Sequence, residues 1–283
     1  MHTTLIQPQE LAALRSDDVV IFDVRHDLAD ATAGESAWRQ ARIPGARFLH
    51  VDRQLSGPRT SSSGRHPLPD RTAFHRLMVE AGVGANQQVV VYDAGDGSTA
   101  ARLWWMLRWL GHEAVAVLDG GWKAWVAAGL PIDDQPRESV PALPGPAAQP
   151  LPLGEPLNGT VDADAVLANL ESHEFVVLDA RAAARYRGEI EPIDPVAGHI
   201  PGALNRPFTE NLEDGRFKSG ARLRDEFLEL LQQRAPHEIV HQCGSGITAC
   251  HNLLAMEHAG LRGSRLYPGS WSEWCSDPRR PVA

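Results

Sequence analysis

The chain has 283 residues, 43% of them hydrophobic and 22% charged, which is typical of a globular protein with one large or two ordinary domains. Its net charge of −9 argues against binding to nucleic acid or an anionic membrane surface, because phosphate contacts need clustered Lys and Arg. We find no signal-peptide pattern at the N-terminus and no stretch near the ~20 apolar residues of a membrane span, so we expect a cytoplasmic protein.

The same succession of segments occurs twice along the chain. Each half contains an apolar strand ending in Asp-x-Arg, an Ile-Pro-Gly-Ala segment, a second strand that leads into a helix, and a closing segment rich in Gly and Trp. In the first half these segments lie at 19–25, 43–46, 89–110 and 118–125, and in the second half at 175–181, 200–203, 239–259 and 266–274. Alternating strands and helices predict an α/β fold with two similar domains, each a mainly parallel sheet flanked by helices.

A proline-rich stretch separates the two halves. Residues 136–157 contain prolines at short intervals, each of which lacks a backbone N–H donor, so a helix or a central strand is excluded there. We therefore predict a first domain over residues 1–135, an extended linker over 136–157 and a second domain over 158–283.

The segment from His241 to Cys250 carries the most reactive group that the sequence offers. Cys243 is expected at a turn between a buried strand and an amphipathic helix, where glycines let successive amide N–H groups point at the sulfur. A thiol at the positive end of a helix is acidified, and its thiolate is a nucleophile. The same donors, from Gly244, Ser245, Gly246, Ile247 and Thr248, are suited to holding a persulfide.

The two halves differ at this turn. Alignment of Gly97 with Gly246 places Ala94 opposite Cys243, so only the second domain has a nucleophile. The first domain is either a scaffold or a source of substrate-binding residues. Three cysteines make neither a disulfide framework nor a zinc site, so we expect free thiols and no metal or organic cofactor.

Taken together, these residues resemble the tandem-domain rhodanese-type sulfurtransferases, in which the C-terminal domain carries the catalytic cysteine. The resemblance covers nearly the whole chain, and the loop Cys-Gly-Ser-Gly-Ile-Thr at 243–248 is most similar to the Cys-Gly-Ser-Gly-Val-Thr loop of 3-mercaptopyruvate sulfurtransferases. It implies transfer of sulfur from 3-mercaptopyruvate through a Cys243 persulfide to cyanide, a small thiol or a protein thiol such as thioredoxin, with release of pyruvate. Thiosulfate sulfurtransferases typically carry Arg and Lys after the cysteine; thiosulfate stays the alternative donor.

The resemblance also implies substrate-binding residues. Arg185 matches the first of two arginines that the mercaptopyruvate enzymes use, whereas Ile193 stands where the second is expected. Either Arg187 or a residue of the first domain takes over this role, or the preferred donor differs. Asp52 and His66 fall where the family's first domain contributes to the substrate cleft.

Each of these residues also has a simpler structural interpretation. Ser245 could serve only the turn, Thr248 only the helix N-cap, and Arg185 only an ion pair with Glu189 or Glu191. His66 could be an ordinary loop residue. Asp179 and Arg181 are expected to form an ion pair that supports the catalytic loop from the end of a strand.

The sequence of the Cys243 loop argues against three other functions. A cysteine-dependent phosphatase needs Cys-x5-Arg, but the sixth residue after Cys243 is Ala249. A non-catalytic binding module would not need the intact Cys243 loop. Gly244 and Gly246 do not form a nucleotide-binding loop either, because no Gly-Lys-Ser/Thr follows them.

Overall fold

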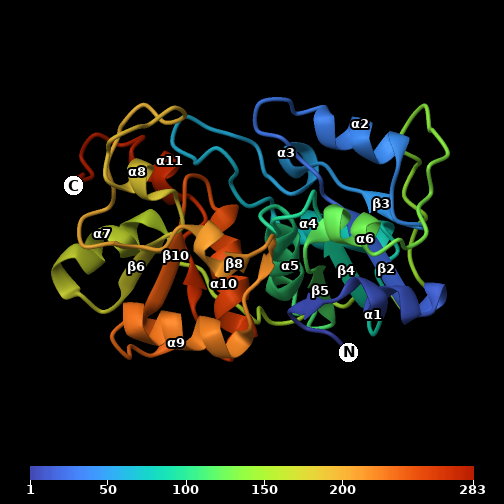
Figure 1. Ribbon diagram of the computed structural model, residues 1–283. Coiled ribbons are helices and arrows are strands. Elements are labelled where there is room, and N and C mark those ends of the chain that lie inside the picture. The colour runs from blue at the N-terminus through green and yellow to red at the C-terminus, as the bar shows by residue number, and fades with distance from the viewer. The chain divides into compact units, whose positions relative to one another are not determined.

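The computed structural model describes residues 1–283 and divides them into two compact units. The first unit contains residues 1–57 and 69–157, and the second contains residues 58–68 and 158–283. Each unit has a parallel sheet with helices packed around it (Figure 1).

The first unit contains a five-stranded sheet in the order β1-β5-β4-β2-β3, with every pair parallel. Its central strand β4 is buried at every position, as expected for an apolar strand covered on both faces. The strands are β1 (Leu5–Ile6), β2 (Val19–Asp23), β3 (Arg47–Phe48), β4 (Gln88–Tyr92) and β5 (Val115–Leu118). The helices are α1 (Pro8–Ala13), η1 (Ser16–Asp18), α2 (Ala33–Gln40), α3 (Val51–Gln54), α4 (Arg71–Glu80), α5 (Ala100–Trp109) and α6 (Gly121–Ala127).

The second unit has a four-stranded parallel sheet in the order β11-β10-β6-β7. A parallel bridge between Thr160 and Leu266 continues the sheet beyond β11, where β1 lies in the first unit. The strands are β6 (Val176–Asp179), β7 (Leu204–Asn205), β10 (Ile239–Gln242) and β11 (Arg265–Leu266), with a separate antiparallel pair β8 (Leu212–Glu213) and β9 (Arg216–Phe217). The helices are α7 (Ala163–Ser172), α8 (Ala183–Tyr186), η2 (Phe208–Asn211), α9 (Gly220–Leu230), η3 (Pro236–Glu238), α10 (Thr248–His258) and α11 (Ser270–Trp274).

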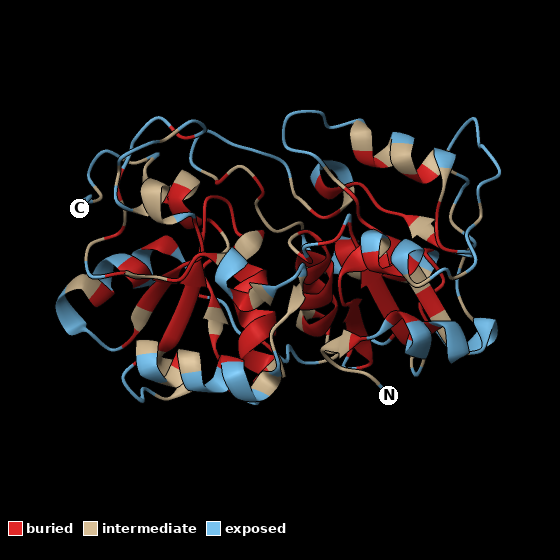
Figure 2. Ribbon diagram, in the orientation of Figure 1, coloured by how far each residue is buried: buried red, intermediate tan, exposed pale blue.

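These sheets confirm the predicted fold class of two α/β domains. Each unit has an almost wholly buried strand that is followed by an almost wholly buried helix (Figure 2). These are β4 and α5 in the first unit, and β10 and α10 in the second. One detail of the sequence analysis is wrong: Thr248 is the first residue of α10, and the N-cap position is held by Ile247 without a side-chain hydrogen bond. Thr248 therefore does not cap the helix.

The contacts of two segments show to which unit each of them belongs. Residues 136–157 belong to the first unit, where the backbone of Gln149, Leu151 and Leu157 hydrogen-bonds to residues 83–108. Residues 58–68 precede most of the first unit but belong to the second, and the amide of Arg65 donates to Oγ of Ser272 at 3.0 Å. The second unit is thus built from two separate parts of the chain.

The core of the second unit supports the site through its tryptophans. Trp271 and Trp274 of α11 are fully buried and pack with residues of β6 and β10. They serve as core residues. None of the helices has the length and apolar character needed to cross a lipid bilayer.

Candidate active site

Cys243 directly follows β10 and stands ahead of α10, at the carboxyl end of the sheet. Its side chain is 2% exposed, and Sγ accepts a hydrogen bond from the amide of Gly246 at 3.1 Å. The backbone is held from α11, since the Cys243 amide donates to Oγ of Ser270 and the Trp271 amide donates to the Cys243 carbonyl. A sulfur facing a backbone N–H at the start of a helix is stabilised as an anion.

Two glycines give the loop its shape. Gly246 has φ +79°, and a Cβ at this position would lie 2.3 Å from the carbonyl oxygen of Pro268. A Cβ on Gly244 would lie 2.9 Å from Nη2 of Arg65. Gly246 therefore requires glycine for its backbone conformation and packing, whereas Gly244 allows the guanidinium group of Arg65 to approach the loop closely.

His66 and Ser245 meet beside the cysteine. Nδ1 of His66 and Oγ of Ser245 are 2.7 Å apart, and both side chains are buried. His66 reaches this position because residues 58–68 belong to the second unit. The pair provides a polar group that can hydrogen-bond a substrate oxygen near Sγ.

Arg185, on α8, faces the loop and also forms the ion pair expected in the simpler interpretation. It contacts Glu191 at 2.6 Å and Asp194 at 3.1 Å, while Nη1 lies 3.5 Å from the position of a Gly244 Cβ. The partner is Glu191 and not Glu189, which pairs with Arg187 at 2.6 Å. Arg187 is 55% exposed, so its guanidinium group is held at the surface.

Arg65 is a site residue that the sequence analysis missed. Besides approaching Gly244, it forms an ion pair with Asp194. Burial lowers the pKa of Arg65, and the negative charge of Cys243 opposes that shift. Arg65 lies next to His66, which was predicted as a site residue. Arg65 itself could not be predicted, because no periodic pattern surrounds it.

Asp179 and Arg181 form the predicted ion pair at the end of β6. Their closest atoms are 2.7 Å apart and both side chains are almost completely buried. The guanidinium carbon of Arg181 also lies 4.7 Å from the ring centre of Trp271, whose amide holds the Cys243 carbonyl. The pair is therefore linked to the Cys243 loop through Trp271.

His241, two residues before Cys243, is an unsuitable acid or base. It is fully buried within β10, and burial lowers its pKa to about 3. The imidazole is therefore neutral at physiological pH. His66 is the histidine that lies at the loop.

Asp52, predicted as a substrate contact, lies in the first unit. It is the second residue of α3, and its carboxylate lies 4.0 Å from Nδ1 of His50. A role for Asp52 at the substrate stays a prediction.

The first unit contains the corresponding turn, filled by one of its own side chains. The carboxylate of Asp93 accepts hydrogen bonds from the amides of Gly95, Gly97, Thr99 and Ala100 at 2.9 to 3.2 Å. Burial raises the pKa of Asp93 to about 6. The turn geometry thus suits an anion in this fold, but the first unit places a carboxylate there and no thiol.

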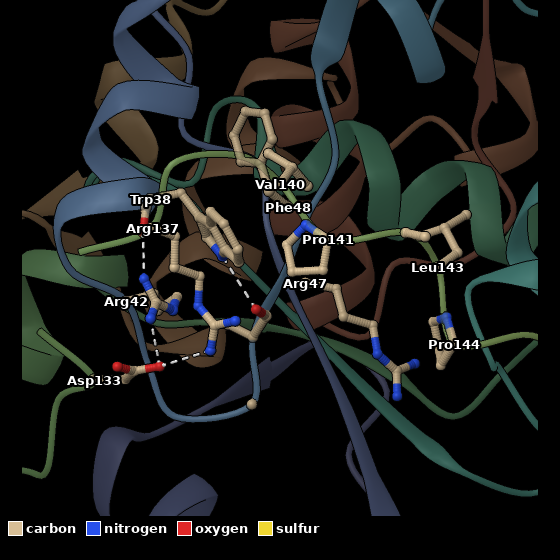
Figure 3. Close-up of a pocket in the computed structure, with 13 residues that line it drawn as sticks. Trp38, Arg42, Arg47, Phe48, Asp133, Arg137, Val140, Pro141, Leu143 and Pro144 are labelled. Atoms are coloured by element: carbon tan, nitrogen blue, oxygen red, sulfur yellow. Dashed lines mark hydrogen bonds and ion pairs between the residues drawn. The ribbon is translucent and has the colours of Figure 1, made fainter. Parts of the chain in front are cut away.

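The first unit also has a cavity of about 230 Å³ beside β3 (Figure 3). Its three arginines already have partners: Arg42 binds Asp133 at 2.6 Å, Arg137 contacts the same carboxylate at 3.5 Å, and Arg47 donates to the carbonyl of Ala81. No Cys, Ser or His lines it. The cavity therefore has no nucleophile and does not compete with the Cys243 loop.

Comparison with known protein families agrees with the repeat seen in the sequence. The model for the rhodanese-like domain matches twice, over residues 7–128 and 162–277. The chain belongs to the rhodanese-like family. Its second rhodanese-like domain contains the Cys243 loop.

The relatives of this rhodanese-like chain include enzymes named for both sulfur donors. A probable 3-mercaptopyruvate sulfurtransferase of Pseudomonas aeruginosa is 46% identical, with 99% of this chain and 97% of the relative covered. A putative thiosulfate sulfurtransferase of Mycobacterium tuberculosis is 38% identical, with 98% and 96% covered. The structure of 3-mercaptopyruvate sulfurtransferase from Leishmania major matches with a TM-score of 0.83 at 31% identity, over 99% of this chain and 75% of that one.

Proposed function

We propose that the chain is a sulfurtransferase that takes sulfur from 3-mercaptopyruvate, holds it as a Cys243 persulfide and passes it to a nucleophilic acceptor. The observation that carries the proposal is the hydrogen bond from the Gly246 amide to Sγ of Cys243 at the start of α10. The Pseudomonas aeruginosa relative, matched over nearly its whole length, supports the choice of donor.

In the first half-reaction the Cys243 thiolate attacks the donor sulfur. A sulfur–sulfur bond forms, the carbon–sulfur bond breaks, and its electron pair leaves on the three-carbon fragment as the enolate of pyruvate, which takes up a proton. Negative charge develops on the keto oxygen in this step. The hydrogen-bonded pair of Ser245 and His66 is suited to stabilising that charge.

In the second half-reaction an acceptor attacks the outer sulfur of the persulfide and restores the thiolate. Before that attack the turn of residues 244–248 holds the persulfide. Cyanide would yield thiocyanate, and a thiol would yield a new persulfide. We propose small thiols and a protein thiol such as thioredoxin as acceptors, and the cytoplasm as the location.

Thiosulfate is the second candidate donor. Ile193 stands in place of an expected arginine, and the Mycobacterium tuberculosis relative is named for thiosulfate. Against this, the two arginines at the loop are matched by Glu191 and Asp194, so the four charges sum to zero. A neutral cluster favours a monoanionic carboxylate over a dianion.

We expect kcat/KM for 3-mercaptopyruvate to exceed that for thiosulfate by at least about tenfold, which corresponds to roughly 1.4 kcal/mol of transition-state stabilisation. The measurement is thiocyanate formation from cyanide with each donor in turn, with pyruvate release followed in parallel for 3-mercaptopyruvate. A preference for thiosulfate would reverse the donor assignment. Turnover of neither donor would remove the proposed function.

A further inference from the structure

Four charged side chains surround the Gly244 side of the catalytic loop: Arg65, Arg185, Glu191 and Asp194. They are largely buried, with 19%, 15%, 4% and 3% of each side chain exposed. Charged groups are rarely buried unless they are paired, and this cluster pairs each cation with a carboxylate. The pairing leaves a definite edge of each guanidinium group unused.

The carboxylates bind Nη1 of Arg65 and the Nε and Nη2 atoms of Arg185. Asp194 uses one oxygen for Nη1 of Arg65 and the other for Nη2 of Arg185. Glu191 binds Nε and Nη2 of Arg185 at 3.2 and 2.6 Å. Nη2 of Arg65 and Nη1 of Arg185 have no hydrogen-bond partner in the protein, and neither atom is sealed from solvent.

These two unpaired nitrogens converge on one point. A Cβ on Gly244 would lie 2.9 Å from Nη2 of Arg65 and 3.5 Å from Nη1 of Arg185. Gly244 is the residue after Cys243, so a ligand bound between the nitrogens lies beside the reactive sulfur. Two guanidinium N–H groups that lie near the same point are suited to a carboxylate.

Arg65 is held firmly enough for this role. Its amide donates to Oγ of Ser272, and a Cβ on the preceding Gly64 would lie 2.5 Å from the Gly269 carbonyl oxygen. The segment is therefore packed closely against the start of α11. The two positions that the sequence suggested for the second arginine lie at the surface. Ile193 is exposed, and Arg187 is paired with Glu189.

We infer that Arg65 and Arg185 together bind the carboxylate of a 2-oxo acid donor, with Arg65 serving in place of the arginine absent at Ile193. Asp194 is a positioning residue that fixes both guanidinium groups and keeps the cluster neutral. This inference rests on the proposed function and adds the residue that recognises the donor carboxylate.

The first experiment compares Arg65→Met with the wild type on 3-mercaptopyruvate and on its neutral methyl ester. We expect the KM for the acid to rise about 10- to 100-fold, as for the loss of a charge-assisted hydrogen bond, with a smaller change in kcat. The KM for the ester should stay the same, because the ester has no charge to bind. Arg65→Lys should recover part of the affinity for the acid.

Arg279→Met is the matched control, because Arg279 forms its ion pair with Asp277 at the surface. It should leave both KM values unchanged. An equal loss with acid and ester in Arg65→Met would show a merely structural role. A rise in KM in Arg187→Met without one in Arg65→Met would also overturn the inference.

Pyruvate binding separates this inference from the proposed function. Pyruvate carries the same carboxylate but has no sulfur to transfer, so its affinity, measured by calorimetry, does not depend on turnover. We expect pyruvate to bind the wild type and to bind Arg65→Met at least about tenfold more weakly. If this difference is found in a protein that does not turn over 3-mercaptopyruvate, the function fails and the carboxylate site stands. Equal affinities would reject the site.

Discussion

Replacing Cys243 by Ser should lower sulfur transfer from either donor by roughly 10⁴-fold or more, the scale seen when a catalytic nucleophile is removed. A serine hydroxyl in the same turn is hardly ionised at neutral pH and is a weak nucleophile toward sulfur. The fold should survive, because the side chain is small and the backbone contacts of residue 243 to Ser270 and Trp271 do not use the sulfur. The measurement is thiocyanate formation, with thermal unfolding followed to verify the fold.

Cys275→Ser is the matched control for this substitution. Cys275 is a half-buried thiol just after α11, and burial raises its pKa, which disfavours the thiolate. Its replacement should leave the rate close to that of the wild type. If activity survives in Cys243→Ser but disappears in Cys275→Ser, Cys275 is the nucleophile and the assignment to Cys243 is wrong.

Replacing Gly246 by Ala should lower kcat/KM by roughly 10²- to 10³-fold, as when one backbone donor of an anion-binding site is displaced. The added Cβ would lie 2.3 Å from the Pro268 carbonyl oxygen, in a backbone conformation with φ +79°. The loop must therefore shift, and the Gly246 amide moves away from the sulfur. Steady-state kinetics with 3-mercaptopyruvate and cyanide measures the loss.

Gly215→Ala tests whether backbone strain alone explains the effect. Gly215 has φ +75°, and a Cβ there has no neighbour within 4 Å. This variant should lose about 1 kcal/mol of unfolding free energy with unchanged kcat/KM. If Gly246→Ala has the kinetics of Gly215→Ala, the Gly246 amide has no role in holding the anion.

Local patterns in the sequence were sufficient for the repeat, the parallel sheets and the turn at Cys243. The apolar runs at 19–25 and 175–181 end in the same Asp-x-Arg, and in both units the two side chains form a buried ion pair. Such contacts join residues two apart, so their spacing is visible in the sequence.

Tertiary contacts decided what the sequence did not show. Residues 58–68 follow the helix α3 of the first unit but pack in the second, and nothing in their composition indicates this. Arg65 was missed for the same reason, because a single arginine in a loop rich in Ser, Gly and Pro has no pattern. The family resemblance pointed to position 193 for the second arginine, whereas the structure brings Arg65 to the loop from a distant part of the chain.

The corresponding turn of the first unit shows the same limit. Its alignment with the second unit places Ala94 opposite Cys243, the predicted nucleophile. It did not indicate that Asp93, one residue earlier, turns its carboxylate back onto four amides of the turn. That arrangement depends on backbone conformation, which spacing alone does not specify.

The most direct test of a persulfide on Cys243 is to mix the wild-type protein with one equivalent of 3-mercaptopyruvate and no acceptor. We expect the release of one pyruvate per chain, together with the addition of one sulfur atom to the peptide that contains Cys243, measured by mass spectrometry. Cyanide should then remove that sulfur as thiocyanate. Pyruvate release without added mass on Cys243, or sulfur carried by Cys250 or Cys275 instead, would contradict it.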